Sequence, residues 1–294
     1  MSGTPPFSII IPAHNEAAVI LRCLETLHQR LPQGRTAPQI IVVCNGCTDN
    51  TAGLVRSNYP QAEVIELAQG SKPLALNTGN AHAKAATRIY LDADVIVDGH
   101  ALTVVADILS AGNGIEVAAP AMTIDLAQCS PMVRAFYRAW QATPYINDGM
   151  VGSGLFALSG AGMARVGEFP PIIADDTYVR NRFAISERKS LRHDDQGQPI
   201  YFTIFPPRDM ATLVRVMARR RVGDLQLFAL VGTPPAEVGS SDVAFVATKL
   251  WRQVAPLDYL TYAAVKLVAR IWGRTMFRTS ETPQWLRDDS SRVA

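Results

Sequence analysis

The chain has 294 residues, of which 48% are hydrophobic, and a formal net charge of +2. This composition indicates a globular protein with a substantial core and excludes a disordered chain. Four cysteines are too few for a disulfide scaffold, and no run of about 18 uncharged apolar residues predicts a membrane span. The N-terminus shows no signal-peptide pattern, so the expected compartment is a reducing cytoplasm.

Apolar runs alternate with amphipathic stretches through the first 122 residues. Strands are expected at 7–11, 39–44, 62–67, 88–95 and 115–122, and helices at 16–31, from Thr48 or Asp49 to about 58, at 72–85 and at 101–111. Asn15 is expected to cap the first helix. Strands and helices that alternate at this spacing predict βαβ units, and therefore an α/β fold with a mainly parallel sheet flanked by helices.

The second half of the chain changes character. A helix is expected at 131–142 and a β-hairpin at 188–205, with Gly197 in its turn. Residues 1–207 carry 15 Lys or Arg against 18 Asp or Glu, whereas residues 208–278 carry 11 against 5. This split predicts an acidic body at 1–207 and a basic helical extension at 208–294. The body is expected to consist of two halves, 1–125 and 126–207.

Two acidic pairs carry the strongest chemical signal. In "YLDADVIV", Asp92 and Asp94 lie one residue apart in an apolar run, so on a strand they would share a face. Two carboxylates this close require a cation between them, and Mg²⁺ or Mn²⁺ held by carboxylates and phosphate oxygens would supply it. A second pair, Asp175 and Asp176, follows "FPPIIA" and could supply a general base in the same cleft.

Two other motifs are weaker signals of function than the acidic pairs. Cys44 and Cys47 form a CxxC, but no second pair completes a zinc site, so they are interpreted as ordinary cysteines in a turn. The glycine-rich stretch 152–167 matches neither a dinucleotide-binding nor a phosphate-binding loop. Its glycines are expected to allow tight turns and the close approach of a bound molecule.

Taken in order, the motifs "IIIPAHNE", "VVCNGCTDNT", "GSKPLALNTGNAHAKA", "YLDADV", "GSGLFALS" and "ADDTYV" resemble those of the family 2 glycosyltransferases, which have the GT-A fold. The resemblance covers about residues 7–185. It implies an inverting, metal-dependent enzyme that moves a sugar from a nucleoside-diphosphate donor to an acceptor hydroxyl. A single addition in polysaccharide or glycolipid assembly is the expected activity.

The resemblance also implies a role for each matching residue. Asp176, the second acid of its pair, would be the catalytic base, and Asp94 would be the metal ligand for Mn²⁺ or Mg²⁺. The implied donor-binding residues are Pro12, Ala13, Asn15, Glu16, Asn45, Asp49, Lys72, Asp92 and Arg221, and the implied acceptor-binding residues are Gly152, Ser153, Gly154 and Asp175.

The chain departs from the family pattern at two places. Cys44-Asn45 stands where the family has an acidic pair, one member of which helps to recognise the uracil of the donor. Because an amide both donates and accepts hydrogen bonds, the nucleobase that this protein prefers stays open. Val222 follows Arg221 where chain-polymerising members have tryptophan, which argues against a processive synthase. The arginines at 219–221 either bind the donor phosphates or form a solvated helix face.

Residues 256–278 predict a helix with a basic stripe formed by Lys266, Arg270, Arg274 and Arg278, and with an apolar side formed by Val265, Val268, Ile271, Trp272 and Met276. Such a helix can lie in the interface of an anionic membrane, which would suit a lipid-linked acceptor at the cytoplasmic face. The alternative is a helix packed on the domain or on a second copy.

Other functions that fit parts of the sequence are a nucleotidyltransferase, a non-catalytic sugar-nucleotide-binding protein and a membrane adaptor. A nucleotidyltransferase would typically open with a glycine-rich basic loop, which "IPAHNEAAV" lacks. The expected partners are a nucleotide sugar, a saccharide or lipid-linked acceptor and an anionic membrane surface. No nucleic-acid partner is expected.

Overall fold

The computed structural model describes residues 4–31, 36–147, 151–232 and 249–279. Its centre is a nine-stranded sheet in the order β3-β2-β1-β4-β7-β6-β9-β5, with β8 pairing beside β6. The strands are β1 (Ser8–Ala13), β2 (Gln39–Asn45), β3 (Glu63–Leu67), β4 (Arg88–Leu91), β5 (Ile96–Val97), β6 (Val117–Ile124), β7 (Leu155–Leu158), β8 (Arg188–Leu191) and β9 (Tyr201–Ile204).

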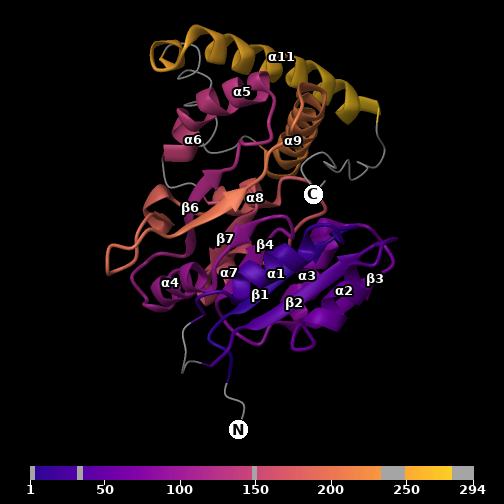
Figure 1. Ribbon diagram of the computed structural model, residues 1–294, viewed down its shortest axis with the longest axis vertical. Coiled ribbons are helices and arrows are strands. Elements are labelled where there is room, and N and C mark those ends of the chain that lie inside the picture. The colour runs from indigo at the N-terminus through magenta and orange to yellow at the C-terminus, as the bar shows by residue number, and fades with distance from the viewer. Residues whose placement is uncertain (1–3, 32–35, 148–150, 233–248, 280–294) are drawn as a thin grey trace.

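Helices cover the sheet and extend beyond it (Figure 1). They are α1 (Ile20–His28), α2 (Thr51–Asn58), α3 (Lys72–His82), α4 (Gly99–Ser110), α5 (Pro131–Gln141), α6 (Pro144–Asn147), α7 (Gly160–Val166), α8 (Asp175–Arg180), α9 (Met210–Val231) and α11 (Pro256–Thr279), with 3₁₀ turns η1 (Ile185–Glu187) and η2 (Leu250–Arg252). Among these described helices, none is both long enough and apolar enough to span a membrane.

The first half of the sheet is parallel, as the alternation of strands and helices predicts. Strands β1 and β2 pair in parallel, as do β2 and β3, and β1 and β4. The apolar runs of β1, β2 and β4 are buried, and Ile9, Ile10 and Ile11 of β1 have no exposed surface, whereas β3 at the edge of the sheet is partly exposed. Because these strands point the same way, the loops that follow them meet at one edge of the sheet.

The second half of the sheet is mixed. Strand β7 lies antiparallel between β4 and β6, whereas β8 and β9 both pair in parallel with β6. The expected hairpin at 188–205 is therefore only partly right. Its turn exists, since Gly197 has φ +77° and His193 bridges Pro199, but the two strands pair with β6 rather than with each other.

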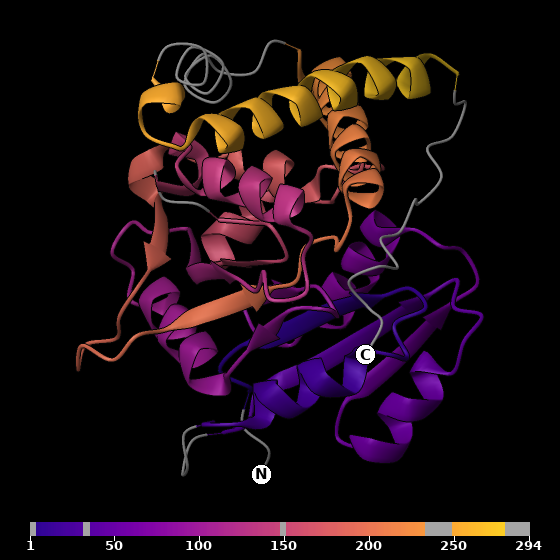
Figure 2. The ribbon, with the colours of Figure 1, turned by 45° about the horizontal axis from the view of Figure 1, so that its top comes forward.

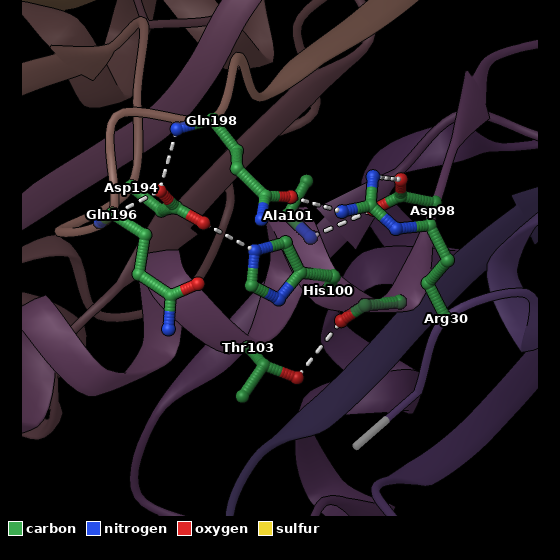
Figure 3. Close-up of polar contacts among 9 residues, drawn as sticks. Arg30, Asp98, His100, Ala101, Thr103, Asp194, Gln196 and Gln198 are labelled. Carbon is green, nitrogen blue, oxygen red and sulfur yellow. Dashed lines mark hydrogen bonds and ion pairs between the residues drawn. The ribbon is translucent and has the colours of Figure 1, made fainter.

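Side-chain contacts fasten the tip of this turn to α4 and to the residues that follow α1 (Figure 3). His100 Nε2 lies 2.8 Å from Asp194 Oδ2. Arg30 donates to Asp98 at 2.9 Å and to Gln198 at 3.0 Å. These contacts fix the β8–β9 connection.

Helices α5, α9 and α11 form a second, smaller core away from the sheet. In Figures 1 and 2, α11 lies across α5 and α9 at the end of the molecule that is farthest from the N-terminus. Their buried side chains include Phe136, Trp140, Leu213, Tyr262 and Val265. Gly273 allows the close crossing of α9 and α11, because a Cβ there would lie 2.8 Å from the carbonyl oxygen of Ala218.

Two local predictions are wrong, both at the edge where the loops meet. Strand β4 ends at Leu91, so Asp92 and Asp94 lie in the turn before β5 and not on a strand. Asn15 does not cap the first helix, which begins four residues later than expected, at Ile20, with Val19 at its N-cap. Asn15 instead has a left-handed backbone, with φ 56°, and its side-chain oxygen accepts hydrogen bonds from the loop after β2.

Candidate active site

The turn that carries Asp92 and Asp94 is fastened to the glycine-rich segment before β7. The backbone N–H of Asp92 donates to the carbonyl oxygen of Gly154 at 2.8 Å, and Val95 N–H closes the turn on the Asp92 carbonyl oxygen at 3.1 Å. Gly154 has φ +109°, and a Cβ there would lie 2.7 Å from Val95 Cγ2. Glycine is therefore required at position 154 for both its conformation and its close approach to the acidic turn.

The protein supplies a cation for its own acidic residues. Lys72, the first residue of α3, places its ammonium 2.7 Å from Asp92 Oδ1 and 3.2 Å from Asp175 Oδ2. Burial lowers the pKa of Lys72, but the charges of Asp175 and Asp92 outweigh burial and raise it. Lys72 therefore stays protonated and joins an acid of the β4–β5 turn to an acid of α8.

Asp175 is the buried acid of its pair, with 5% of its surface exposed. Burial raises its pKa to about 6 even though the Lys72 charge acts in the opposite direction. The carboxylate of Asp175 lies against Lys72, at 3.2 Å from its ammonium.

Asp176 is half-buried, and its carboxylate is held by backbone donors. Its Oδ2 accepts from the Ser153 N–H at 3.1 Å, and its Oδ1 accepts from the Thr177 N–H at 2.7 Å. Burial raises its pKa, but the Ser153 N–H, the Arg220 charge and the Lys72 charge together lower it below the ordinary value for aspartate. The carboxylate is therefore ionised and fixed in orientation at neutral pH.

The segment Gly152–Gly154 fits closely around that carboxylate. All three residues have positive φ, with Ser153 at 59°, a conformation that a non-glycine residue adopts at a cost. A Cβ on Gly152 would lie 2.9 Å from Asp176 Cβ. The predicted acceptor-side segment thus contacts Asp176 at Gly152 and Ser153 and Asp92 at Gly154.

Asn15 and Asp49 connect the loops after β1 and β2. Asn15 Oδ1 accepts from the backbone N–H groups of Thr48 at 2.7 Å and Asp49 at 3.2 Å. Asp49 Oδ2 accepts from Ala17 N–H at 3.0 Å, and its Oδ1 accepts from Thr51 N–H at the start of α2. These two polar residues shape the loop pair, here called the nucleotide loop (residues 12–17 and 44–51).

Four other residues expected to bind the donor are buried. Pro12 and Ala13 lie in β1, and Glu16 is 6% exposed. Asn45 is 1% exposed, its Nδ2 donates to the Ala13 carbonyl oxygen at 2.9 Å, and its Oδ1 accepts from Ser71 N–H at 2.9 Å. The Asn45 amide therefore bonds to the backbone of both neighbouring segments, and the donor-binding role expected of Asn45 stays a prediction.

Arg221, also expected to bind the donor, lies on α9 (Met210–Val231). Arg221 packs against α11, where a Cβ on Gly273 would lie 2.8 Å from Arg221 Cβ, and its Nη1 lies 3.8 Å from Asp224 Oδ2. The neighbouring Arg220 is exposed, lies over the Trp140 ring at 5.9 Å and acts on the pKa of Asp176. The sequence of three consecutive arginines gives no signal for which of them acts on the pKa of Asp176, because that depends on the packing of α9.

The acidic turn fits a metal that substrate phosphates help to coordinate. Among the residues that the structure describes, no three His, Cys, Asp or Glu side chains gather in a way that would hold a metal ion by themselves. Mg²⁺ and Mn²⁺ are commonly held by one or two carboxylates plus substrate phosphates. Because Asp92 is bound to Lys72, the donor set fits an ion on Asp94 completed by a diphosphate.

Comparison with known proteins points to one family. Residues 8–126 match the model of glycosyl transferase family 2. Glycosyltransferase AglE of Haloferax volcanii is 36% identical over 100 residues, which are 32% of this chain and 32% of the relative's length. The matched segment thus spans about a third of that relative.

Solved structures extend the similarity to the fold of nearly the whole chain. Mannosyltransferase PcManGT from Pyrobaculum calidifontis, in complex with GDP-Man and Mn²⁺, covers 95% of this chain and 88% of its own, with a TM-score of 0.63 at 18% identity. S. aureus TarS 1–349, in complex with UDP-GlcNAc, covers 90% and 91% with a TM-score of 0.54 at 16% identity. Glucosyl-3-phosphoglycerate synthase from Mycobacterium tuberculosis covers 78% and 81%, with a TM-score of 0.53 at 17% identity.

These structures share the mixed α/β architecture, with its curled, mainly parallel sheet between helices. The family match falls on the segment that holds the nucleotide loop and the acidic turn. The chain therefore has the GT-A fold of these glycosyltransferases, and its residues 8–126 match the model of glycosyl transferase family 2.

Proposed function

We propose that the protein transfers a sugar from a nucleoside-diphosphate donor to an acceptor hydroxyl, with inversion at the anomeric carbon. The supporting observation is the Asp176 carboxylate, oriented by Ser153 N–H in the same short segment whose Gly154 carbonyl accepts from Asp92 N–H. One rigid segment thus joins the candidate base to the acidic turn. A single addition in polysaccharide or glycolipid assembly is the activity that we propose.

In this mechanism the acceptor hydroxyl attacks the anomeric carbon of the donor sugar. Asp176 takes the proton of that hydroxyl, and the nucleoside diphosphate leaves from the opposite face. The lowered pKa of Asp176 keeps the carboxylate ready to accept a proton at neutral pH. General base catalysis of this kind contributes about 10²- to 10⁴-fold to the rate.

Asp94 is the residue that we propose as the protein ligand for Mn²⁺ or Mg²⁺. A divalent ion bound there would neutralise negative charge on the departing diphosphate. The donor side would consist of Asn15, Asp49, Lys72 and Asp92, and the acceptor side of Gly152, Ser153, Gly154 and Asp175. Mn²⁺ in the solved complexes of the mannosyltransferase and of the phosphoglycerate synthase supports a metal at this turn.

The domain division that we propose places the catalytic domain at 1–207 and a helical region at 208–294. Within the catalytic domain, 1–125 would bind the donor and 126–207 the acceptor. The end of β9 at Ile204 and the start of α9 at Met210 support the boundary at 207. Helix α5 belongs to the acceptor half by sequence but packs on α11, so the acceptor side and the helical region share a core.

We further propose that α11 docks on the anionic cytoplasmic face of a membrane, where a lipid-linked acceptor would present its sugar end. The helix has three faces. Val265 and Ala269 are buried against α5 and α9, whereas the charged stripe Lys266, Arg270, Arg274 and Arg278 is exposed. Large apolar side chains are exposed along the remaining face, namely Leu257, Leu260, Leu267, Val268, Ile271 and Trp272.

The apolar side predicted for this helix included Val265 and Met276, but in the structure Val265 is buried and Met276 is half-buried. A helix that packs on the protein with one face and exposes a second apolar face beside a basic stripe fits a headgroup boundary. Each Lys or Arg near anionic lipid adds about 1 kcal/mol of attraction.

A panel of UDP- and GDP-sugars with Mn²⁺ tests the reaction, with thermal shift for donor binding and sugar release for turnover. We expect one donor to stabilise the protein, and Asp176→Asn to keep that shift while losing about 10²-fold or more of the rate. Asp195→Asn, which changes an exposed acid near Gly197, is the control. Donor binding without turnover in the wild-type protein would favour a non-catalytic binding protein, and pyrophosphate release from a nucleoside triphosphate would favour a nucleotidyltransferase.

Vesicle co-sedimentation at low salt tests the docking of α11. The protein should pellet with anionic vesicles and stay in solution with neutral ones. Ile271→Glu should reduce the bound fraction, whereas Ile185→Glu, at a similarly exposed isoleucine of η1, should not. Equal loss in both variants, or no pelleting of the wild-type protein, would reject the docking proposal without affecting the transfer reaction.

A further inference from the structure

A series of contacts runs from α3 through the acidic turn to the candidate base. Lys72 Nζ lies 2.7 Å from Asp92 Oδ1, and the Asp92 N–H donates to the Gly154 carbonyl oxygen at 2.8 Å. The residue before Gly154 is Ser153, and its N–H donates to Asp176 Oδ2 at 3.1 Å. The series thus connects Lys72 to the Asp176 carboxylate through two backbone hydrogen bonds and one ion pair.

Asp175 closes this series into a ring. It precedes Asp176 in α8, and its buried Oδ2 lies 3.2 Å from the Lys72 ammonium. The side chain of Asp175 is 7% exposed and that of Lys72 is 18% exposed, against 35% for Asp92. Water therefore screens the closing contact less than it screens the pair of Lys72 with Asp92. The six residues are here called the contact ring: Lys72, Asp92, Ser153, Gly154, Asp175 and Asp176.

The beginning of α8 depends on contacts with other elements. Its N-cap residue is Ala174, whose side chain has no atom that could accept a hydrogen bond from the first turn. Just before it, Ile173 donates its N–H to Gln226 Oε1 of α9 at 2.9 Å. Helix α9 thus holds the chain that enters α8, whereas Lys72 holds the first residue of the helix itself.

A movement of this first turn would move the base. Asp176 is the second residue of α8, and outside the helix the Ser153 N–H holds its carboxylate, whereas the Thr177 N–H moves with α8. On the donor side, Lys72 still has Asp92 as its partner when the Asp175 carboxylate is lost. Loss of Asp175 therefore affects the placement of the base more than the donor side.

We propose that Asp175 is a positioning residue for the transfer reaction, which acts through Lys72 to hold the Asp176 carboxylate in place relative to the acidic turn. The proposal rests on the proposed function, because it takes Asp176 as the base. The two adjacent acids then have separate roles. Asp176 takes the proton of the acceptor hydroxyl, and Asp175 contributes to the acceptor side without touching the acceptor.

Donor hydrolysis tests the positioning role, with water as the acceptor and the UDP- or GDP-sugar that gives turnover as the donor. Asp175→Leu keeps a similar side-chain size, carries no charge and accepts no hydrogen bond. We expect it to lower kcat about 10- to 100-fold, since a displacement of about 1 Å can cost about 10²-fold, and to change the donor KM less than about threefold. Asp175→Asn, which keeps one acceptor oxygen for Lys72, should lie between that variant and the wild-type protein. Asp195→Asn, at an exposed acid, is the control and should leave both constants unchanged.

The kinetic outcomes separate positioning from direct contact. Because water is the acceptor, loss of a contact to a saccharide would leave this rate unchanged. An unchanged kcat in both variants of Asp175 would therefore overturn the positioning role. A higher donor KM with an unchanged kcat would overturn it as well, since Asp175 would then act on donor binding.

Hydrogen–deuterium exchange without substrate tests the contact ring independently of activity. In both variants of Asp175, the peptides that contain Ser153 and Asp92 should exchange faster than in the wild-type protein, while α4 should exchange at the same rate. Unchanged exchange at Ser153 in a folded variant, or equally faster exchange in α4, would overturn the ring. Wild-type protein that hydrolyses no nucleotide sugar would instead count against the proposed function, and the exchange rates would still decide whether Asp175 holds Asp176 in place.

Discussion

Replacing Lys72 by methionine should destabilise the protein in a strongly pH-dependent way. The substitution keeps most of the side-chain volume and removes the charge between Asp92 and Asp175. The Asp92 carboxylate is 35% exposed, so water screens it and its pair with Lys72 contributes at most about 1 kcal/mol. The Asp175 side chain is 7% exposed, so most of the cost arises there.

The magnitude follows from what Asp175 does without its partner. Breaking a buried ion pair costs about 3–5 kcal/mol when the remaining group stays charged and buried. Asp175 can avoid this by taking up a proton, because burial already raises its pKa to about 6 and loss of Lys72 removes the charge that opposes this rise. We therefore expect a loss of about 2–4 kcal/mol at pH 8 and a smaller loss at pH 5.

The direction of the pH effect follows from the difference between the pKa of Asp175 in the folded state and in the unfolded state. An aspartate with a folded pKa above its unfolded value keeps its proton in the folded state as pH rises, so stability falls with pH between the two values. In the wild-type protein this decline ends near the folded pKa of about 6. In Lys72→Met the folded pKa is higher, so the decline should continue above pH 6 and separate the two proteins there.

Urea unfolding followed by circular dichroism at pH 5 and pH 8 measures the difference. Lys84→Met, at an exposed lysine shortly after α3, is the control and should cost less than about 0.5 kcal/mol at either pH. Lys72→Met combined with Asp175→Asn should recover most of the loss at pH 8, because the buried charge is gone. An equal loss at both pH values, or additive effects in the double variant, would refute a charge bridge between Lys72 and Asp175.

Three further predictions concern the metal ligand, the glycine-rich segment and the second core. Asp94→Ala should weaken the affinity for nucleotide in Mn²⁺ at least 10-fold, as measured by calorimetry, and leave the weak affinity without metal unchanged. Equal affinity with and without chelator in the wild-type protein would contradict the metal role. Gly152→Ala should abolish most transfer and lower the unfolding midpoint more than Gly197→Ala. Both positions have positive φ, but only a Cβ at position 152 would clash with Asp176. Equal effects of the two substitutions on activity would contradict this reasoning. Asp258 is 4% exposed and receives two hydrogen bonds from Arg138, at 2.8 and 2.6 Å, whereas the Arg138 side chain is 52% exposed and screened by water. Arg138→Ala should therefore cost about 1–3 kcal/mol and increase hydrogen exchange in α11. Unchanged exchange there would refute a link between α5 and α11.

Much of the architecture follows from the sequence because parallel strands buried on both faces are continuous apolar runs. The runs at 7–11, 39–44 and 62–67 correspond to β1, β2 and β3 within one or two residues. Chain direction then requires that the loops after β1, β2 and β4 meet at one edge of the sheet. For the same reason the acidic turn and the nucleotide loop could be assigned to one edge of the sheet from the sequence alone, whereas chain direction does not place the Asp175–Asp176 pair at the start of α8.

The sequence did not reveal which partner each charge would have. The sequence predicts a metal ion at Asp92 and Asp94, but it gives no sign that Lys72 of α3 also bridges Asp92 and Asp175. Ion pairs between distant segments depend on the packing of whole helices, and local patterns contain no information about that packing. The amide of Asn45 illustrates the same limit, because its backbone partners come from neighbouring segments of the fold.

By itself, the sequence determined the alternation of strands and helices, the edge where the site forms and the residue types available there. These features depend on burial and chain direction, and both can be inferred from the local hydrophobic periodicity. Only the tertiary structure decided that Arg220 rather than Arg221 acts on Asp176, that β8 and β9 both pair with β6, and which face of α11 is exposed. Each of these depends on how one element rotates or pairs against another, and that choice is made by the packing of side chains from distant parts of the chain.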